Sequence, residues 1–277
     1  MYRDVWKLLR KDWLALLCST LLALSPLIGA AVVWDVIALL VMATSVPVYS
    51  GRIDTPEPAN PWLAAHLQDW MFAALAVLSA LLVLAWFYLG PWLQMGIYGG
   101  LTDSLRGGKM QKADAAMFRG RIRKAHSGRF LTRVLPLCMP VLLAVFWSSL
   151  GNDLYEVRHL WLLALALTFL VRTALVFIPP LQADFPKLSG WELCDRSREL
   201  LRRLGPIRLI LWTLPGVIGY LGCSVLFWVC FEATGTPIGL CLGWTLTALL
   251  TALPAMYTRA AIAVAYTEAL RRENAAA

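Results

Sequence analysis

The side chains that carry out most enzyme chemistry are few in this 277-residue sequence and lie far apart along it. The histidines are His66, His126 and His159, and the six cysteines form no Cys-x-x-Cys pair. Metal binding and nucleophilic catalysis both need several such groups at short, defined spacings. The sequence therefore predicts no catalytic residue, no metal site and no cofactor.

A glycine-rich stretch over residues 99–109 invites comparison with the loop that binds nucleotide phosphates. That loop has the form Gly-x-x-x-x-Gly-Lys-Ser/Thr and joins a strand to a helix. Here Asp103 replaces the first glycine, Met110 follows Lys109, and an apolar run precedes the stretch. The Gly-x-Ser-x-Gly turn of serine hydrolases is absent from the sequence as well. We therefore expect a chain that is not an enzyme and has no nucleotide site of its own.

Two ionisable residues stand inside long apolar runs. Arg172 lies near the middle of Leu160–Pro180, and Asp35 is the only charge in Trp13–Ser50. A charge within a membrane span is costly and often marks a polar pathway or a contact with a substrate anion. The alternative is a structural Arg172 that is satisfied by backbone carbonyls or a neighbouring helix. Asp35 is its candidate partner, although a helix that starts with the run would place Asp35 near the outer face.

The composition shows which elements must position these residues. Hydrophobic residues make up 59% of the chain and charged residues 15%, and the mean hydropathy is +0.65. Ordinary globular proteins have about 45–50% and about 25% respectively. A soluble fold could not cover its surface with so few charges. The sequence therefore predicts an all-α polytopic membrane protein.

The apolar runs predict six transmembrane helices, because one span needs about 20 residues. Their approximate bounds are 13–34, 71–100, 131–150, 160–180, 208–231 and 237–265, within a single membrane domain over residues 1–277. The first run continues to Ser50 and is too long for one span. We interpret Asp35–Ser50 as an outer interfacial or re-entrant piece. A tilted first helix, or one kinked near Pro26, is the alternative.

The distribution of basic residues predicts how these spans are threaded. With six spans, 22 of the 25 Lys and Arg residues fall on one side of the membrane, two on the other, and Arg172 within a span. Cytoplasmic loops carry such an excess. We therefore expect both termini in the cytoplasm, and we assign the positive charge to anionic lipid headgroups or a cytoplasmic neighbour rather than to nucleic acid.

Three basic cytoplasmic segments are predicted to be amphipathic helices on the inner interface, with their apolar faces in lipid. They are residues 2–13, 109–125 and 190–204. The third begins with the capping box Ser189–Glu192 and ends at Gly205–Pro206. Its apolar face contains Leu193, Ser197, Leu200 and Leu204. Glu192–Arg196 and Glu199–Arg203 have the spacing of intrahelical ion pairs.

The basic residues of the two cytoplasmic loops have two interpretations, as anchors to lipid headgroups or as a docking surface for a partner. The candidates are Arg119, Arg121, Arg123, Lys124, Arg196, Arg202 and Arg203. Small residues at helical spacings predict close helix packing, either within the bundle or in a homodimer. These glycines are Gly96, Gly100, Gly216, Gly219, Gly239 and Gly243.

Four stretches carry a resemblance that covers about two-thirds of the chain. They are Gly96–Phe118, Phe177–Asp184, Ser197–Gly205 and the end of the chain, where Tyr266 precedes Arg271 and Arg272. With them the chain resembles a loose group of bacterial six-helix membrane proteins of unknown function. The group includes the membrane domain that precedes some glycerophosphodiester phosphodiesterases. The resemblance implies a multi-pass protein of the bacterial cytoplasmic (inner) membrane, and we expect no phosphodiesterase domain in this chain.

These patterns favour two functions. The first is a non-catalytic integral membrane subunit that anchors or assembles with a partner at the cytoplasmic face. The alternative is the permease subunit of an ATP-driven (ABC-type) exporter, which would need a separate cytoplasmic ATPase and a second copy or another membrane subunit. The sequence leaves the substrate, the direction of transport and the oligomeric state open.

Overall fold

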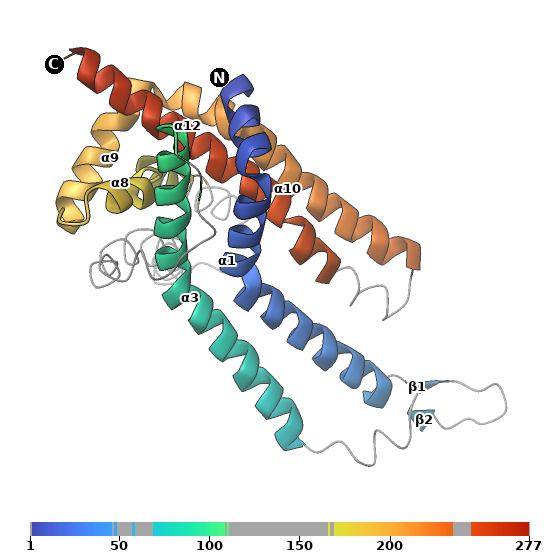
Figure 1. Ribbon diagram of the computed structural model, residues 1–277. Coiled ribbons are helices and arrows are strands. Elements are labelled where there is room, and N and C mark those ends of the chain that lie inside the picture. Colours follow the sequence, from blue (N-terminus) through green and yellow to red (C-terminus); the bar gives the residue numbers. More distant parts are fainter. Residues whose placement is uncertain are drawn as a thin grey trace, which may run out of the picture. The chain divides into compact units, whose positions relative to one another are not determined.

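The computed structural model describes residues 2–45, 47–48, 57–58, 69–108, 110, 166, 169–234 and 245–276. These residues are helical apart from short turns and one antiparallel pair of two-residue strands, β1 (Pro47–Val48) and β2 (Glu57–Pro58). The helices are α1 (Tyr2–Ser45), α3 (Asp69–Leu105), α8 (Ile178–Asp184), α9 (Gly190–Leu204), α10 (Pro206–Thr234) and α12 (Ala252–Ala276) (Figure 1). The all-α class is therefore confirmed.

Four helices are long and apolar enough to cross a membrane. They cover Tyr2–Ile37, Trp70–Leu105, Pro206–Leu226 and Thr245–Ala275, the regions of the first, second, fifth and sixth predicted spans. The third predicted span lies outside the described residues. Of the fourth, residues 169–174 are helical, a turn follows, and α8 begins at Ile178. The count of six spans and their threading stay predictions.

The first helix departs from our interpretation of the long N-terminal run. It continues through Asp35 to Ser45, so the structure shows a continuation of the helix as far as Ser45 rather than a separate outer piece beginning at Asp35. A kink comes at Asp12 (φ −123°, ψ 23°), and Pro26 stands inside the helix further along the chain. The Asp12 carboxylate accepts a hydrogen bond from the Ser104 hydroxyl, which ties the kink to the end of α3.

At two of the prolines that stand inside helices, a hydroxyl replaces the lost hydrogen bond. A proline leaves the carbonyl four residues earlier without its helical donor. For Pro26 that carbonyl belongs to Leu22, and the Ser25 hydroxyl donates to it over 2.8 Å. For Pro215 it belongs to Leu211, and the Tyr2 hydroxyl donates to it over 2.7 Å. Apolar helices tolerate proline when such groups satisfy the freed carbonyl.

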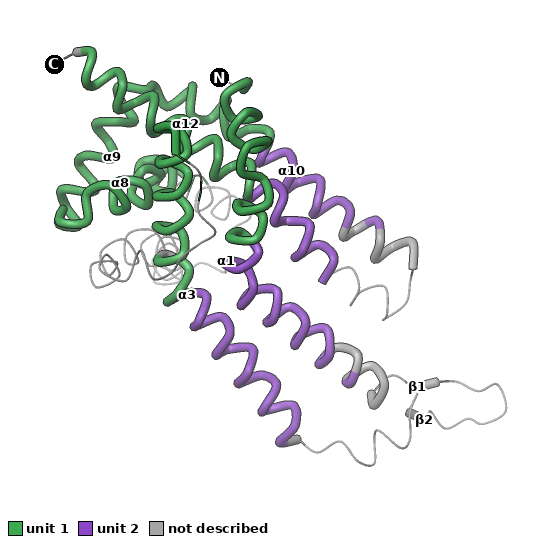
Figure 2. Tube along the Cα trace, viewed as in Figure 1, with its two compact units in different colours: residues 1–20, 87–215, 256–277 green, residues 21–86, 216–255 purple. Residues whose placement is uncertain are grey.

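The chain divides into two compact units (Figure 2). Unit 1 comprises Met1–Thr20, Phe87–Pro215 and Met256–Ala277, and unit 2 comprises Leu21–Trp86 and Gly216–Ala255. Unit 1 has a packed core in which residues 260–265 of α12 are all buried. The rings of Phe177 and Tyr266, both completely buried, lie 6.0 Å apart there.

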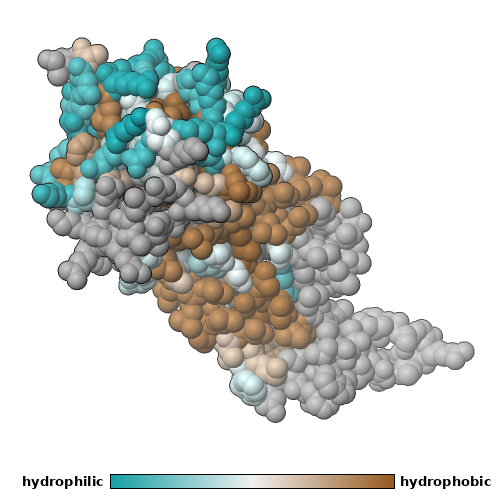
Figure 3. All heavy atoms as spheres, in the orientation of Figure 1, coloured by the Kyte–Doolittle hydropathy of each residue, from teal (hydrophilic) through white to brown (hydrophobic). Residues whose placement is uncertain are grey.

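Unit 2 has small residues inside and large apolar residues outside. Ala23, Ala30 and Ser79 are buried, whereas Leu81 is 57% exposed and Leu221 is 61% exposed. Figure 3 shows this brown, apolar surface along the helices, and shows hydrophilic side chains gathered over α9 and the last turns of α12 in unit 1. An apolar surface of this extent needs lipid as its solvent.

Candidate functional site

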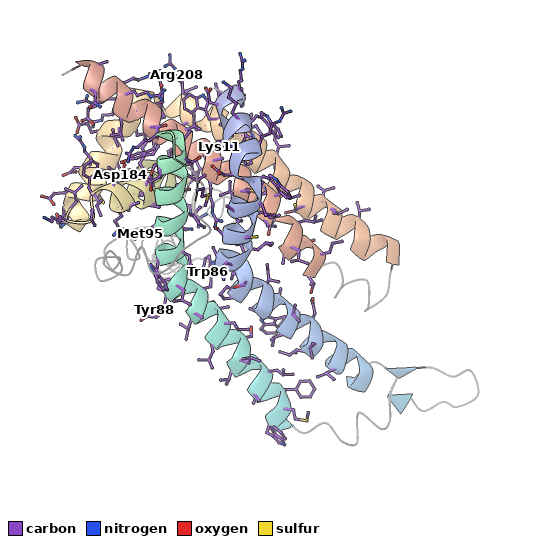
Figure 4. The ribbon with its side chains drawn as sticks, in the orientation of Figure 1. Lys11, Trp86, Tyr88, Met95, Asp184 and Arg208 are labelled. Carbon is purple, nitrogen blue, oxygen red and sulfur yellow. The ribbon has the colours of Figure 1, made fainter. Side chains whose placement is uncertain are left out.

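A cavity of about 630 Å³ lies within unit 1, formed by the first turns of α1 and α10 and the last turns of α3 and α12. We call it the basic pocket. Its basic residues are Lys7, Lys11, Arg208, Arg271 and Arg272, and its acidic residues are Asp4 and Glu268. Leu8, Trp212 and Val264 add apolar surface. Figure 4 labels Lys11 on α1 and Arg208 on α10.

The first turns of α1 place two lysines in the basic pocket because Lys7 and Lys11 lie one helical turn apart. Val5, Leu8 and Leu9 are buried and fix this segment to unit 1. The N-terminal amphipathic helix is therefore present, but its Val5 and Leu9 pack against protein. Our expectation that this whole face lies in lipid is wrong.

Lys11 also caps the end of α3. Its Nζ donates to the carbonyls of Ser104 (3.1 Å) and Gly108 (2.5 Å). Gly107 has a φ of +103°, a conformation that favours glycine and ends the helix here. A positive charge at these carbonyls also opposes the negative end of the helix dipole. The Lys11 ammonium is thus held by neutral oxygen atoms.

The arginines of the basic pocket differ in their partners. Arg272 Nε contacts Glu268 at 3.1 Å, and one of its terminal nitrogens donates to the Arg203 carbonyl at 3.4 Å. Arg208 and Arg271 are exposed and form no ion pair with a carboxylate among the described residues. Their guanidinium groups are therefore available to an anion.

A second polar cluster joins three helices of unit 1 through Asp184. Its carboxylate accepts two hydrogen bonds from Arg106, at 2.6 and 3.3 Å, and a third from the Tyr266 hydroxyl at 3.0 Å. This ion pair raises the pKa of Arg106 above its usual value. A carboxylate with all these partners is satisfied, so the cluster anchors α8 to Arg106, directly after α3, and to the middle of α12.

The structure confirms the predicted start and end of α9. The Ser189 hydroxyl accepts from the Glu192 backbone N–H, and the Glu192 carboxylate accepts from the Ser189 N–H, which lowers the pKa of Glu192. The helix ends at Gly205, whose φ is +89°. The predicted apolar face of Leu193, Ser197, Leu200 and Leu204 is buried. It packs against protein rather than lipid, since the Ser197 hydroxyl donates to the Ala174 carbonyl at 2.8 Å.

Two of the three predicted docking arginines on α9 are engaged within the chain. Arg196 contacts Glu199 at 3.1 Å and Glu273 of α12 at 2.7 Å. Arg203 contacts the same two carboxylates at 2.7 and 3.9 Å. The hydrogen bonds from Arg203 and then Arg196 lower the pKa of Glu199. The Glu199–Arg203 pair is confirmed, whereas Arg196 pairs with Glu199 and Glu273 in place of Glu192. Arg202 is exposed.

The predicted intramembrane charges belong to different units. Asp35 is buried in unit 2 and accepts a hydrogen bond from the Thr245 hydroxyl at 2.5 Å. Arg172 is in unit 1, in the helical stretch 169–174, with its side chain exposed. A functional role for either residue stays a prediction.

The predicted packing glycines are described only in part. Gly219 lies so close to Pro254 that an added Cβ would come within 2.9 Å of the proline Cβ. Gly100 faces Met110, whose Cγ would be 3.1 Å from such a Cβ. Gly216 is buried and Gly96 is half-buried. Outside the described residues lie Gly239, Gly243 and the loop candidates Arg119, Arg121, Arg123 and Lys124.

No protein-family model, no curated protein and no solved structure matches this chain. The basic pocket is the feature that sequence reasoning missed. Its basic residues come from three regions of the sequence, and each was assigned to the general positive charge of the cytoplasmic side. The one usable signal is that basic residues stand at the ends of four long apolar helices.

Proposed function

We propose that this chain is a non-catalytic integral membrane subunit in the cytoplasmic membrane of a bacterium. It assembles with a partner through the exposed face of α9 in unit 1. One observation carries the proposal: the apolar face of α9 is buried against unit 1, whereas its opposite face is exposed. Trp191 is 82% exposed, and Arg198 and Arg202 are exposed along the same helix. Exposed Trp and Arg side chains are typical anchors of protein interfaces.

The way α9 is held supports this role. Its apolar face is buried, and Arg196 and Arg203 attach it to Glu273 of α12. A partner therefore meets a surface that is already ordered, and little conformational entropy is lost when it binds. A helix that served only as a membrane anchor would keep its apolar face for lipid.

The test compares complexes purified in mild detergent. A partner should co-purify in fixed stoichiometry with the wild type and be lost from the double variant Trp191→Ala, Arg202→Glu. Trp34→Ala is the matched control, because Trp34 is also strongly exposed (57%) but belongs to an apolar span of unit 2. A partner that stays bound to the α9 variant, or the absence of any stoichiometric partner, would contradict the proposal.

The permease of an ATP-driven exporter is the second candidate, and Asp35 favours it. A buried carboxyl group in an apolar helix is a common feature of transport pathways. In this case the co-purified partner should be an ATPase, and Asp35→Asn should reduce transport without reducing the abundance of the complex. Recovery of the chain without an ATPase or a second copy would exclude this alternative.

A further inference from the structure

The basic pocket holds more positive charge than the described carboxylates around it neutralise. Asp4 and Lys7 both line it, and Glu268 pairs with Arg272. Lys11 has only carbonyl partners, and neither Arg208 nor Arg271 contacts a carboxylate within the described ranges. Like charges gathered around one cavity repel one another unless an anion enters.

The position of the basic pocket specifies the kind of anion. Its residues occupy the first turns of two candidate spans (Tyr2–Ile37 and Pro206–Leu226) and the last turns of the other two (Trp70–Leu105 and Thr245–Ala275). The end of a membrane span is where lipid headgroups lie. Arg208 is also in the first turn of α10, where the helix dipole attracts negative charge.

The size and lining of the basic pocket suit a phosphate group that carries an organic substituent. A volume of about 630 Å³ falls among small-molecule sites and exceeds the space needed for one inorganic ion. Guanidinium and ammonium groups are the usual ligands of phosphate oxygens. Trp212, which is 8% exposed, and Leu8 provide apolar surface for the substituent.

We propose that the basic pocket binds a phosphate group, carried by an anionic lipid headgroup or by a phosphate compound free in solution, between Lys11, Arg208 and Arg271. Binding would bring α1, α10 and α12 together around one anion and stabilise unit 1. The inference does not depend on the proposed partner at α9.

The test uses the full chain in nanodiscs of phosphatidylcholine, with and without phosphatidylglycerol, and native mass spectrometry to count bound lipids. Arg208→Gln with Arg271→Gln should weaken retention of phosphatidylglycerol about tenfold or more, because two charge-assisted contacts are lost. Lys11 is left unchanged because it caps α3. The matched control is Arg198→Gln with Arg202→Gln, which removes the same charge from the exposed side of α9 and should change retention less than about twofold.

A second arm separates the two sources of the phosphate. Inorganic phosphate and glycerol phosphate are titrated into the chain in phosphatidylcholine nanodiscs, and thermal stability is measured. Stabilisation by phosphatidylglycerol alone assigns the basic pocket to a lipid headgroup. Stabilisation by a soluble phosphate that disappears in Arg208→Gln, Arg271→Gln assigns it to a free ligand. Equal losses of phosphatidylglycerol retention in the pocket and control variants would overturn the proposal. So would the absence of any stabilisation by phosphatidylglycerol or by a soluble phosphate.

The pocket variants are checked for folding by circular dichroism. Should the double variant fail to fold, Arg271→Gln alone replaces it, because Arg271 is an exposed residue in the last turns of α12. The single variant should weaken lipid retention several-fold while the wild-type helix content is kept. Retention equal to the wild type in a folded Arg271→Gln protein would overturn the proposal as well.

Discussion

The two units of this chain differ in whether they have a core of large apolar side chains. In unit 1, Phe177, Leu181 and Tyr266 are completely buried, and charged residues gather on α9 and α12. In unit 2, Leu81 and Leu221 are more than half exposed and small residues occupy the interior. The difference shows that one all-helical chain serves two solvents, because burial of large side chains gains free energy against water but gains little against lipid.

The polar contacts of the two units differ in the same way. Unit 1 has ion pairs between helices, such as Arg106–Asp184 and Arg196–Glu273. In unit 2, the Thr245 hydroxyl donates a hydrogen bond to the Asp35 carboxylate, and Gly219 lies close to Pro254. Salt bridges suit a region that meets water, whereas hydroxyl hydrogen bonds and small residues hold helices together in lipid.

The largest expected effect tests the difference in burial directly. Phe177→Ala removes a fully buried ring from unit 1 and should lower the free energy of unfolding by about 3–5 kcal/mol. Leu221→Ala, at a position 61% exposed in unit 2, should cost less than about 1 kcal/mol in a bilayer. Denaturation in nanodiscs measures both. Equal losses of unfolding free energy in the two variants would show that unit 2 depends on the burial of large side chains as unit 1 does.

An intermediate effect tests whether small residues hold unit 2 together. Gly219→Ala would place a Cβ 2.9 Å from Pro254, and we expect a loss of about 1–3 kcal/mol. Gly222→Ala is the matched control on the same helix, since nothing lies within 4 Å of its added Cβ. That change should be neutral or slightly stabilising, because alanine favours helices more than glycine. Thermal denaturation in the same lipid compares them, and equal behaviour of the two variants would remove the case for close packing.

The smallest expected effect is the weakening of the Glu199 ion pairs in unit 1 when the pH is lowered. Hydrogen bonds from Arg203 and Arg196 lower the pKa of Glu199 below its usual value of 4.5. A lowered pKa in the folded state contributes stability that is present above pH 4.5 and is lost as the pH falls through the folded-state value. Glu199 is exposed to solvent in part, so solvent screens these ion pairs and we expect this to be the smallest of the three effects.

The acid experiment compares the wild type with Glu199→Gln between neutral pH and pH 3. The stability difference between the two proteins should shrink as the pH falls below 4.5, because the wild-type carboxylate becomes protonated. Amide hydrogen exchange within α9 locates the change in unit 1. A difference that stays constant with pH would show that the Glu199 ion pairs contribute no stability.

Local features of the fold could be predicted from the sequence. The start of α9 at Ser189 and its end at Gly205 follow from a capping box and a glycine, both of which depend only on neighbouring residues. The long apolar helices follow from hydropathy for the same reason. The kink could not be predicted in this way. No proline or glycine marks the kink at Asp12, whose carboxylate accepts a hydrogen bond from Ser104 on a distant helix.

The candidate sites depended more on distant contacts. The sequence showed Arg196, Arg202 and Arg203 as one basic group, and the structure separates them because Glu273 approaches Arg196 and Arg203 but leaves Arg202 exposed. The basic pocket combines Lys11, Arg208 and Arg271, which are separated by many residues along the chain. No periodic pattern predicts a site whose members belong to different helices.

The sequence by itself determined the helical class, the long apolar segments and the amphipathic face of α9, because periodicity, hydropathy and helix caps act between near neighbours. Only the tertiary structure decided what covers each face. The apolar face of α9 packs on protein, and the apolar surface of unit 2 stays exposed. An apolar face gains free energy by leaving water for either environment, so its composition cannot distinguish protein from lipid. The contacts between distant residues make that distinction.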